Sequence, residues 1–180
     1  MSDAGSSNVS LGQIRALALD VDGVLTDGAV WWGPDKEEWK RFSFTDIMGV
    51  SLARRAGLKL ALISGEDSPL VDRYAAKMHI QHVAKACRDK ASALRGFSEA
   101  TRIELSSICY MGDDINDLSA MKIAGLSAAP ANAASEVLAH VDFIAKRSGG
   151  NGAVRELIDA LLASRGMSAL DVFSQGSDAT

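Results

Sequence analysis

Two pairs of carboxylates, each following a short apolar run, carry the chemistry that this sequence suggests. Asp20 and Asp22 come after the first run, and Asp113 and Asp114 come after a later one. In an open α/β sheet, ligands bind where the parallel strands end, so these carboxylates would face one site. Asp20 could attack phosphorus as a nucleophile, and Asp22 could serve as general acid and base. Because carboxylates and a phosphate dianion repel one another, this chemistry also needs a hard cation, which Mg²⁺ fits.

Two further residues could neutralise the charge of a phosphate. Ser64 follows the apolar run 59–63, and its hydroxyl and nearby backbone N–H groups could bind a phosphate oxygen. Lys90 opens a helical segment and could place a cation against the phosphate. Taken singly, Ser64 is more often a helix cap and Lys90 a solvated surface residue, and Asp113-Asp114 could be a turn or a cap. Their joint placement after successive apolar runs favours a phosphoryl-transfer site.

The elements that would position these residues alternate along the chain between strand and helix. This pattern predicts an α/β fold, a Rossmann-like parallel sheet flanked by helices. Strands are expected at 14–19, 59–63, 82–84, 107–110, 126–128 and 142–144. Helices are expected at about 47–56, 69–78, 90–97, 117–124, 133–138 and 152–164.

Residues 28–44 break this alternation. Two aromatic segments flank the turn-rich sequence Gly33-Pro34-Asp35-Lys36, which predicts a protruding β-hairpin. The chain has three tryptophans, and all of them lie in this hairpin. An isolated hairpin is marginally stable in water, so the aromatic side chains must pack somewhere. They could pack on their own domain, or they could form a subunit interface, where aromatic residues are enriched.

Length and composition bound the remaining possibilities. The 180 residues predict one domain over residues 12–166, with a disordered leader at 1–11 and a flexible tail at 167–180. The net charge of −4 argues against a nucleic-acid partner. No apolar run approaches the roughly 20 residues that span a bilayer, and the N-terminus lacks the features of a signal peptide. Cys87 and Cys109 are expected to stay reduced, which predicts a cytoplasmic protein.

The four candidate segments resemble the signature motifs of the haloacid dehalogenase superfamily of phosphotransferases. Asp20-Val21-Asp22-Gly23 resembles the first motif, Ser64 the second, Lys90 the third and residues 112–117 the fourth. The resemblance covers residues 14–164. It implies that Asp20 is the nucleophile and that Asp22 is the acid and base.

The same resemblance implies a set of magnesium ligands. Mg²⁺ would be held by Asp20, by the main-chain carbonyl of Asp22 and by Asp113. Asp114 and Asp117 would support these ligands from the fourth motif.

A closer similarity is to a small subfamily that hydrolyses the 8- or 9-phosphates of 3-deoxy-ulosonic acids. The segments 22–28, 42–50 and 149–156 carry it. Little more than the hairpin and one helix separates Asp22 from Ser64, so the chain has no room for a large cap domain. In such capless relatives the hairpin builds a homotetramer, and a neighbouring subunit closes the site.

The subfamily also implies a set of substrate contacts, from which this chain departs in part. The expected contacts are Thr26, Gly65, Glu66, Lys77 and Arg147. Glu66 stands where the octulosonate branch usually has Arg, and Ile47 stands where it has Gly. Glu66, with Lys77 on the same expected helix, is more similar to the nine-carbon branch. Lys77 could meet a substrate carboxylate from an adjacent subunit or be an ordinary surface residue, and Arg147 is a second candidate anion contact.

These observations predict a Mg²⁺-dependent phosphomonoesterase that acts on a phosphorylated 3-deoxy-ulosonate through an aspartyl phosphate at Asp20. Its ligand would be a small sugar acid phosphate with either eight or nine carbons. A first alternative is a non-catalytic tetramerisation module that works with a sugar cytidylyltransferase. A second alternative is a phosphatase for another small sugar phosphate.

Overall fold

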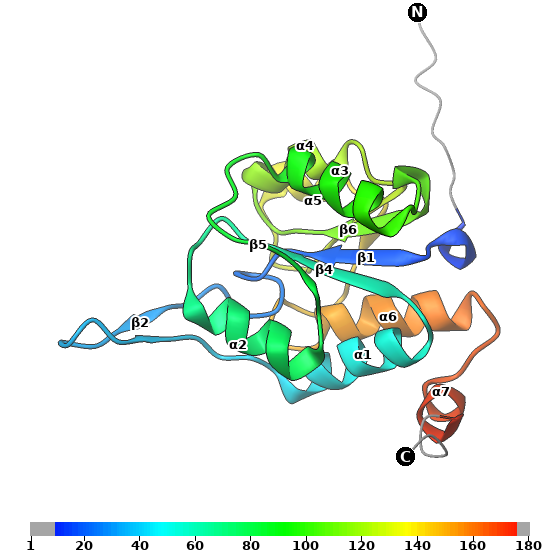
Figure 1. Cartoon of the computed structure of the whole chain (residues 1–180), viewed down its shortest axis with the longest axis horizontal. Coiled ribbons are helices and arrows are strands. Elements are labelled where there is room, and N and C mark those ends of the chain that lie inside the picture. The colour runs from blue at the N-terminus through cyan, green and yellow to red at the C-terminus, as the bar shows by residue number, and fades with distance from the viewer. Residues whose placement is uncertain (1–9, 176–180) are drawn as a thin grey trace, which may run out of the picture.

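A six-stranded parallel sheet lies between two layers of helices in the computed structural model, which describes residues 10–175 (Figure 1). The strands follow the spatial order β5-β4-β1-β6-β7-β8, and every neighbouring pair is parallel. They are β1 (Ala16–Leu19), β4 (Lys59–Ile63), β5 (His82–Ala84), β6 (Ile108–Met111), β7 (Leu126–Ala129) and β8 (Phe143–Ile144). The predicted α/β fold class is confirmed.

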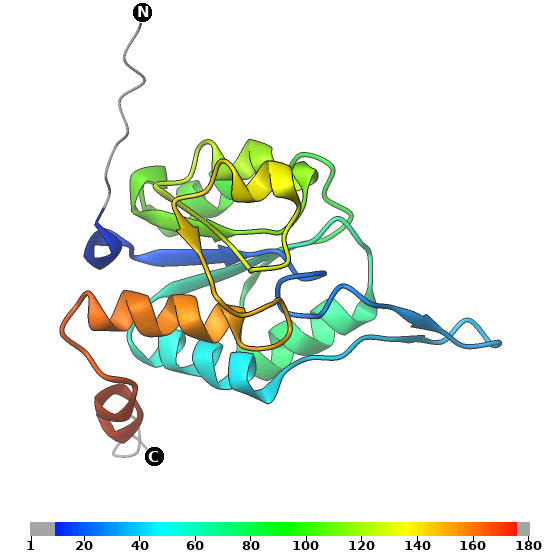
Figure 2. The ribbon, with the colours of Figure 1, turned by 180° about the vertical axis from the view of Figure 1, so that it is seen from behind.

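The helices form one layer on each face of the sheet (Figures 1 and 2). One layer contains α3 (Lys90–Thr101), α4 (Leu118–Met121) and α5 (Ser135–Leu138), and the other contains α1 (Phe44–Arg55), α2 (Pro69–Met78) and α6 (Ala153–Ala163). Successive side chains of a strand point to opposite faces, and β1 follows this rule. Leu17 and Leu19 pack in the core beneath α1 and α6, whereas Ala16 and Ala18 pack beneath α3 and α4.

The register of the central strands brings three polar segments together. Leu19 at the end of β1 pairs with Leu62 on β4 and with Met111 on β6. The next residue, Asp20, donates its backbone N–H to the carbonyl of Met111 at 2.9 Å. The segments that follow β1, β4 and β6 therefore start side by side at the carboxyl edge of the sheet.

Several element boundaries differ from those expected. Helix α1 begins at Phe44, before the expected residue 47, because the Ser43 hydroxyl caps it by accepting a hydrogen bond from Thr45 N. Helix α3 continues to Thr101. The expected helix over 117–124 is instead a 3₁₀ turn (Ile115–Asp117) followed by the four residues of α4.

The predicted hairpin is present and projects from the body of the molecule (Figures 1 and 2). Its strands, β2 (Trp31–Trp32) and β3 (Glu38–Trp39), pair antiparallel. Trp31 and Trp39 are each 54% exposed and Trp32 is 77% exposed. The tryptophans are therefore only partly covered by their own chain and are not part of either core cluster.

The described part of the C-terminal segment corrects the expectation of a flexible tail. Residues 169–175 form helix α7 (Ala169–Gln175), and Val172 is buried in the core. Arg55 anchors this helix, since its guanidinium donates to the carbonyl of Phe173 at 3.1 Å and lies over the Phe173 ring. At the other end, Leu11 begins a 3₁₀ turn (Leu11–Gln13) that packs partly against the core. The rest of the expected leader and tail, 1–9 and 176–180, lies outside the described residues.

No helix within residues 10–175 is both long and apolar enough to cross a bilayer.

Helix α6 depends on a cap from another helix. Gly152, which precedes α6, has a positive φ of 105° and no cap of its own. Asp46 of α1 is buried, and its carboxylate accepts hydrogen bonds from the backbone N–H groups of Gly152 at 2.9 Å and Arg155 at 3.0 Å. Because the first N–H groups of a helix have no partner within it, Asp46 both caps α6 and joins it to α1.

Replacing Asp46 with Ala should lower the free energy of unfolding by about 2 kcal/mol, because one buried and one partly buried backbone N–H group lose their acceptor. Asp46→Asn keeps one acceptor oxygen and removes a charge whose burial raises the pKa of Asp46, so it should lose less than the Ala variant. Urea unfolding followed by circular dichroism measures both values. An unchanged stability in Asp46→Ala would show that this cap is unimportant.

Candidate active site

Lys90 is the centre of a buried charge cluster at the carboxyl edge of the sheet. Only 1% of its side chain is exposed, and its Nζ lies 3.0 Å from Asp20 Oδ2 and 2.7 Å from Asp117 Oδ1. Asp89 caps the N-terminus of α3 by accepting from Ser92 N, which fixes Lys90 as the first residue of the helix. The third expected motif therefore meets the first and the fourth inside the protein.

Asp117 organises the segment that follows β6. Its Oδ1 also accepts from the hydroxyl of Tyr110 at 2.6 Å. Its Oδ2 accepts from the backbone N–H groups of Asp113 at 3.0 Å and Asp114 at 3.2 Å. With Lys90 included, the fully buried Asp117 carboxylate has four donors, so its role in this structure is to hold the other groups in place.

Asp113 and Asp20 give the site a negative charge that the described side chains do not fully offset. One carboxylate oxygen from each of Asp20, Asp113 and Asp117 lies within 4.8 Å of the others. Burial, followed by the charge of Asp117, raises the pKa of Asp20 to about 7, although Lys90 opposes this. Burial and the charges of Asp117 and Asp114 raise the pKa of Asp113 to about 7 as well. Since all donors are hard carboxylate oxygens, this set fits a divalent cation such as Mg²⁺.

Gly23 allows Asp113 to lie against the loop that follows β1. Its φ is +83°, and a Cβ atom built there would collide with the Asp113 carboxylate. The loop is held from inside by Thr26, whose Oγ1 accepts from Gly23 N and Gly28 N, both at 3.2 Å. Gly23, Gly28 and Thr26 therefore shape the loop after β1 so that its backbone can lie close to the Asp113 carboxylate.

Asp22 has a partner that the sequence patterns did not reveal. The Nζ atom of Lys40, just after β3, lies 2.8 Å from Asp22 Oδ1. Glu38 and Lys40 alternate along the base of the hairpin and so share a face, but nothing in their spacing indicates contact with Asp22. The sequence also did not indicate the role of Tyr110. It lies within an otherwise apolar strand, so its pattern indicates burial and not a hydrogen bond to Asp117.

Most of the expected site residues surround one pocket of about 230 Å³. Its lining includes Asp20, Asp22, Gly65, Glu66, Lys90 and Asp113, together with Asp114. Ser64 lies directly before this lining and is buried; its Oγ accepts from Glu66 N at 3.1 Å. The Ser64 side chain is therefore next to the pocket but covered in this structure.

Three expected substrate contacts lie elsewhere in this chain. Thr26 is fully buried, its hydroxyl oxygen accepts hydrogen bonds within the loop, and it does not line the acidic pocket. Lys77 lines a different pocket of about 240 Å³ with Lys40 and Tyr74. Arg147 does not line the acidic pocket, and its backbone N–H donates to Glu156.

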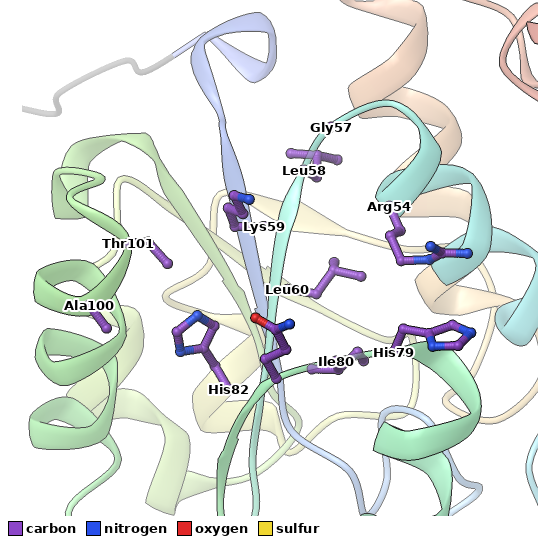
Figure 3. Close-up of a pocket in the computed structure, with 11 residues that line it drawn as sticks. Arg54, Gly57, Leu58, Lys59, Leu60, His79, Ile80, His82, Ala100 and Thr101 are labelled. Carbon is purple, nitrogen blue, oxygen red and sulfur yellow. The ribbon is translucent and has the colours of Figure 1, made fainter. Parts of the chain in front are cut away.

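A larger cavity of about 590 Å³ lies at the opposite, amino end of the sheet (Figure 3). Its charged or titratable lining residues are Arg54, Lys59, His79 and His82. Figure 3 shows that His79 and His82 point away from each other. Because these groups do not converge and include no carboxylate, the smaller acidic pocket is the candidate active site.

The model of the haloacid dehalogenase-like hydrolase family matches residues 50–157, more than half of the chain. The chain belongs to the haloacid dehalogenase-like hydrolases. The predicted membership of that superfamily is thereby confirmed, and the parallel sheet with flanking helices is the fold of its solved relatives.

Relatives of this haloacid dehalogenase-like hydrolase share a name. The 3-deoxy-D-manno-octulosonate 8-phosphate phosphatase of Escherichia coli K12 is 37% identical over 153 residues, which cover 85% of this chain and 81% of that protein. The enzyme of that name from Moraxella catarrhalis was solved in complex with magnesium, phosphate and KDO. It matches with a TM-score of 0.88 at 34% identity over 97% of this chain and 99% of that one. The cobalt-bound enzyme of Haemophilus influenzae matches with a TM-score of 0.88 at 33% identity, over 93% and 98% of the two chains.

Replacing Lys90 with Met in this hydrolase should lower the free energy of unfolding by about 3–5 kcal/mol at pH 8, since two buried carboxylates lose their cation. Burial already raises the pKa of Asp20, and Lys90 opposes this, so without Lys90 the pKa of Asp20 in the folded state rises further. The loss should therefore shrink as the pH falls to about 5 and the Asp20 carboxyl protonates in the folded state.

Urea unfolding of the Lys90→Met variant at both pH values measures this effect. Lys85→Met is the matched control, because Lys85 pairs with Asp67 and Asp72 at the exposed surface and should matter little. A Lys90→Met protein as stable as the control would contradict the structural role of the buried ammonium.

Proposed function

We propose that this chain is a Mg²⁺-dependent phosphoric monoester hydrolase whose substrate is a phosphorylated 3-deoxy-ulosonate. The observation that carries the proposal is the pocket in which the buried Asp20–Lys90 pair lies beside Asp22. The relatives named as 3-deoxy-D-manno-octulosonate 8-phosphate phosphatases support the choice of substrate. We take the eight-carbon sugar acid 8-phosphate as the first candidate.

The first half of the reaction forms an aspartyl phosphate. Lys90 holds one carboxylate oxygen of Asp20 and leaves the other to attack phosphorus. As the new O–P bond forms, the bond between phosphorus and the sugar oxygen breaks, and its electron pair stays on the sugar oxygen. Asp22 donates its proton to that oxygen, so the sugar leaves as an alcohol.

The second half returns the protein to its starting state. Asp22, now a carboxylate, takes a proton from a water molecule whose oxygen attacks phosphorus. The bond between phosphorus and Asp20 breaks, its electron pair restores the Asp20 carboxylate, and inorganic phosphate leaves. Asp22 ends the cycle protonated, ready for the next leaving group.

Groups that the fold holds in place stabilise the negative charge on the phosphoryl oxygens. Lys90, which lines the pocket, offers its ammonium, and Ser64, which directly precedes the lining residue Gly65, is proposed to offer its hydroxyl. Asp20, Asp113 and the main-chain carbonyl of Asp22 would hold Mg²⁺, with Asp114 beside them. When bound, Mg²⁺ offsets the negative charge of the carboxylates and of the phosphate.

Glu66 supports a second candidate substrate. It lines the pocket next to Gly65, and a carboxylate there accepts hydrogen bonds from hydroxyl groups but repels a carboxylate. A longer, nine-carbon ulosonate 9-phosphate could offer such hydroxyls. Lys77 and Arg147, which lie outside the pocket of one chain, could then meet the substrate carboxylate from a neighbouring subunit.

Substrate profiling with Mg²⁺ tests the proposal. The two ulosonate phosphates should exceed hexose phosphates in kcat/KM by at least about tenfold, as expected when a pocket hydrogen-bonds groups that only one substrate has. Asp20→Asn should lower kcat by at least about 10³-fold with the fold intact. Asp72→Asn, on the exposed face of α2, is the matched control and should keep full activity.

Each contrary result has a distinct meaning. Faster turnover of hexose phosphates would overturn the ulosonate assignment, and full activity in Asp20→Asn would overturn the mechanism. No phosphate release from any substrate by the folded wild-type protein would favour the assembly module that works with a cytidylyltransferase.

We also propose that the hairpin assembles a homotetramer. Trp31 and Trp39 pair across its strands and are half exposed, and Trp32 is more exposed still. Exposed clusters of large apolar side chains mark interaction surfaces, and closed symmetric assemblies use the same patch on each subunit.

Sedimentation equilibrium should give four chain masses of 19.0 kDa for the wild-type protein. The Trp31→Ser/Trp39→Ser double variant should dissociate without losing helical circular dichroism, because the hairpin lies outside both cores. Ile144→Ser, which changes an exposed apolar residue away from the hairpin, should leave the assembly intact. A monomeric wild-type protein would contradict the proposal.

A cytoplasmic location completes the proposal. Cys87 and Cys109 are free thiols, a state that persists in reducing compartments.

A further inference from the structure

The carboxylate of Asp22 has one polar partner among residues 10–175. Lys40 Nζ lies 2.8 Å from its Oδ1 atom, and its Oδ2 atom makes no hydrogen bond or ion pair with the described side chains. Asp22 lines the acidic pocket, and 31% of its side chain is exposed. Nothing else in this part of the chain therefore fixes which way this carboxylate points.

Lys40 is itself firmly held. Only 5% of its side chain is exposed, and its Nζ lies 3.4 Å from Glu38 Oε1. Burial alone would lower the pKa of Lys40, but the carboxylates of Asp22 and Glu38 raise it, so the side chain stays a cation. Because the Lys40 ammonium is buried and contacts two carboxylates, it is held in one position more firmly than the ammonium of a surface lysine.

These contacts extend into the body of the domain. Glu38 accepts a hydrogen bond from the hydroxyl of Ser68 at 2.8 Å, and Ser68 caps the N-terminus of α2. Phe42, two residues after Lys40, stacks on Tyr74 of α2 with ring centroids 4.9 Å apart. The base of the hairpin is thus fixed on α2, on both sides of Lys40.

The two lysines of the site have separate partners. Lys90 contacts Asp20 and Asp117, whereas Lys40 contacts Asp22 and Glu38. We infer that Lys40 is a positioning residue, which holds one oxygen of Asp22 so that the other exchanges the proton with the leaving oxygen and with water. This inference rests on the proposed phosphatase function and assigns a role to a residue outside the four motifs.

The leaving group distinguishes this role from a purely structural one. An alkoxide needs a proton as it departs, whereas p-nitrophenolate departs readily without one. A misdirected Asp22 should therefore slow phosphoryl transfer from an alkyl phosphate and spare transfer from p-nitrophenyl phosphate. The value of kcat/KM reports this first half of the reaction alone, because hydrolysis of the aspartyl phosphate follows it.

The experiment compares Lys40→Met with the wild-type protein on two substrates. These are p-nitrophenyl phosphate and 3-deoxy-D-manno-octulosonate 8-phosphate, or the alkyl phosphate that the wild-type protein hydrolyses fastest. Lys40→Met should lower kcat/KM for the alkyl phosphate by about 10–100-fold, the scale of a misplaced general acid. For p-nitrophenyl phosphate the loss should stay below about threefold, since little general-acid catalysis is needed there.

Two further variants sharpen the comparison. Lys40→Arg keeps a cation within reach of Asp22 and should restore most of the alkyl-phosphate activity. Lys36→Met, at the exposed tip of the same hairpin, should behave as the wild-type protein on both substrates. A fraction of misfolded protein lowers both activities equally, so the ratio of the two kcat/KM values remains informative even if Lys40→Met is less stable.

Three outcomes would overturn the inference. They are an equal loss on both substrates, no loss on either, or a rise in KM for the alkyl phosphate with kcat unchanged, which would make Lys40 a substrate contact. Failure of the proposed function would look different, because the wild-type protein itself would then hydrolyse neither substrate.

Discussion

Negative charge buried at the carboxyl edge of the sheet is the constraint on which the rest of this structure depends. Asp20, Asp113 and Asp117 gather there around one buried ammonium, that of Lys90. Burying several carboxylates is costly unless each is held by hydrogen bonds or ion pairs and a bound ligand neutralises the remaining negative charge. The donors around Asp117 and the glycine against Asp113 supply the orientation, and a divalent cation with a phosphate completes the site.

The fold separates the chemistry from the parts that would select the substrate. The nucleophile and its lysine lie within the rigid sheet and helix layers, where the register of β1, β4 and β6 sets their spacing. Asp22 lies at the rim, between this interior and the hairpin that carries Lys40 and the exposed tryptophans. If the hairpin forms a subunit interface, the contact between Lys40 and Asp22 would connect that interface to the proposed general acid.

The alternation of strands and helices was enough to predict the fold class. The polar residues that directly follow apolar strands were enough to predict most of the residues that line the pocket. Asp20, Ser64 and Asp113 could be found because each follows an apolar strand, and parallel strands end at a common edge. Lys40 could not, since its contact with Asp22 depends on how the hairpin folds back on the loop after β1. Tyr110 could not, since a tyrosine within an apolar strand indicates burial and not its hydrogen bond to Asp117. Thr26, expected at the substrate, is instead buried within the loop after β1, because a hydroxyl that could bind a ligand can equally bind backbone N–H groups. Helix α7 was not predicted because its few apolar residues form no clear helical pattern in the sequence, and their packing becomes evident only in the folded structure.

Direct trapping of the phosphorylated residue tests the central claim most closely. Wild-type protein mixed with substrate and Mg²⁺ is quenched within milliseconds, reduced with borohydride to convert an acyl phosphate into homoserine, and sequenced by mass spectrometry. We predict that Asp20 alone is converted, and that Asp22, Asp113 and Asp117 are not modified. Conversion at another carboxylate, or none while phosphate is being released, would contradict it.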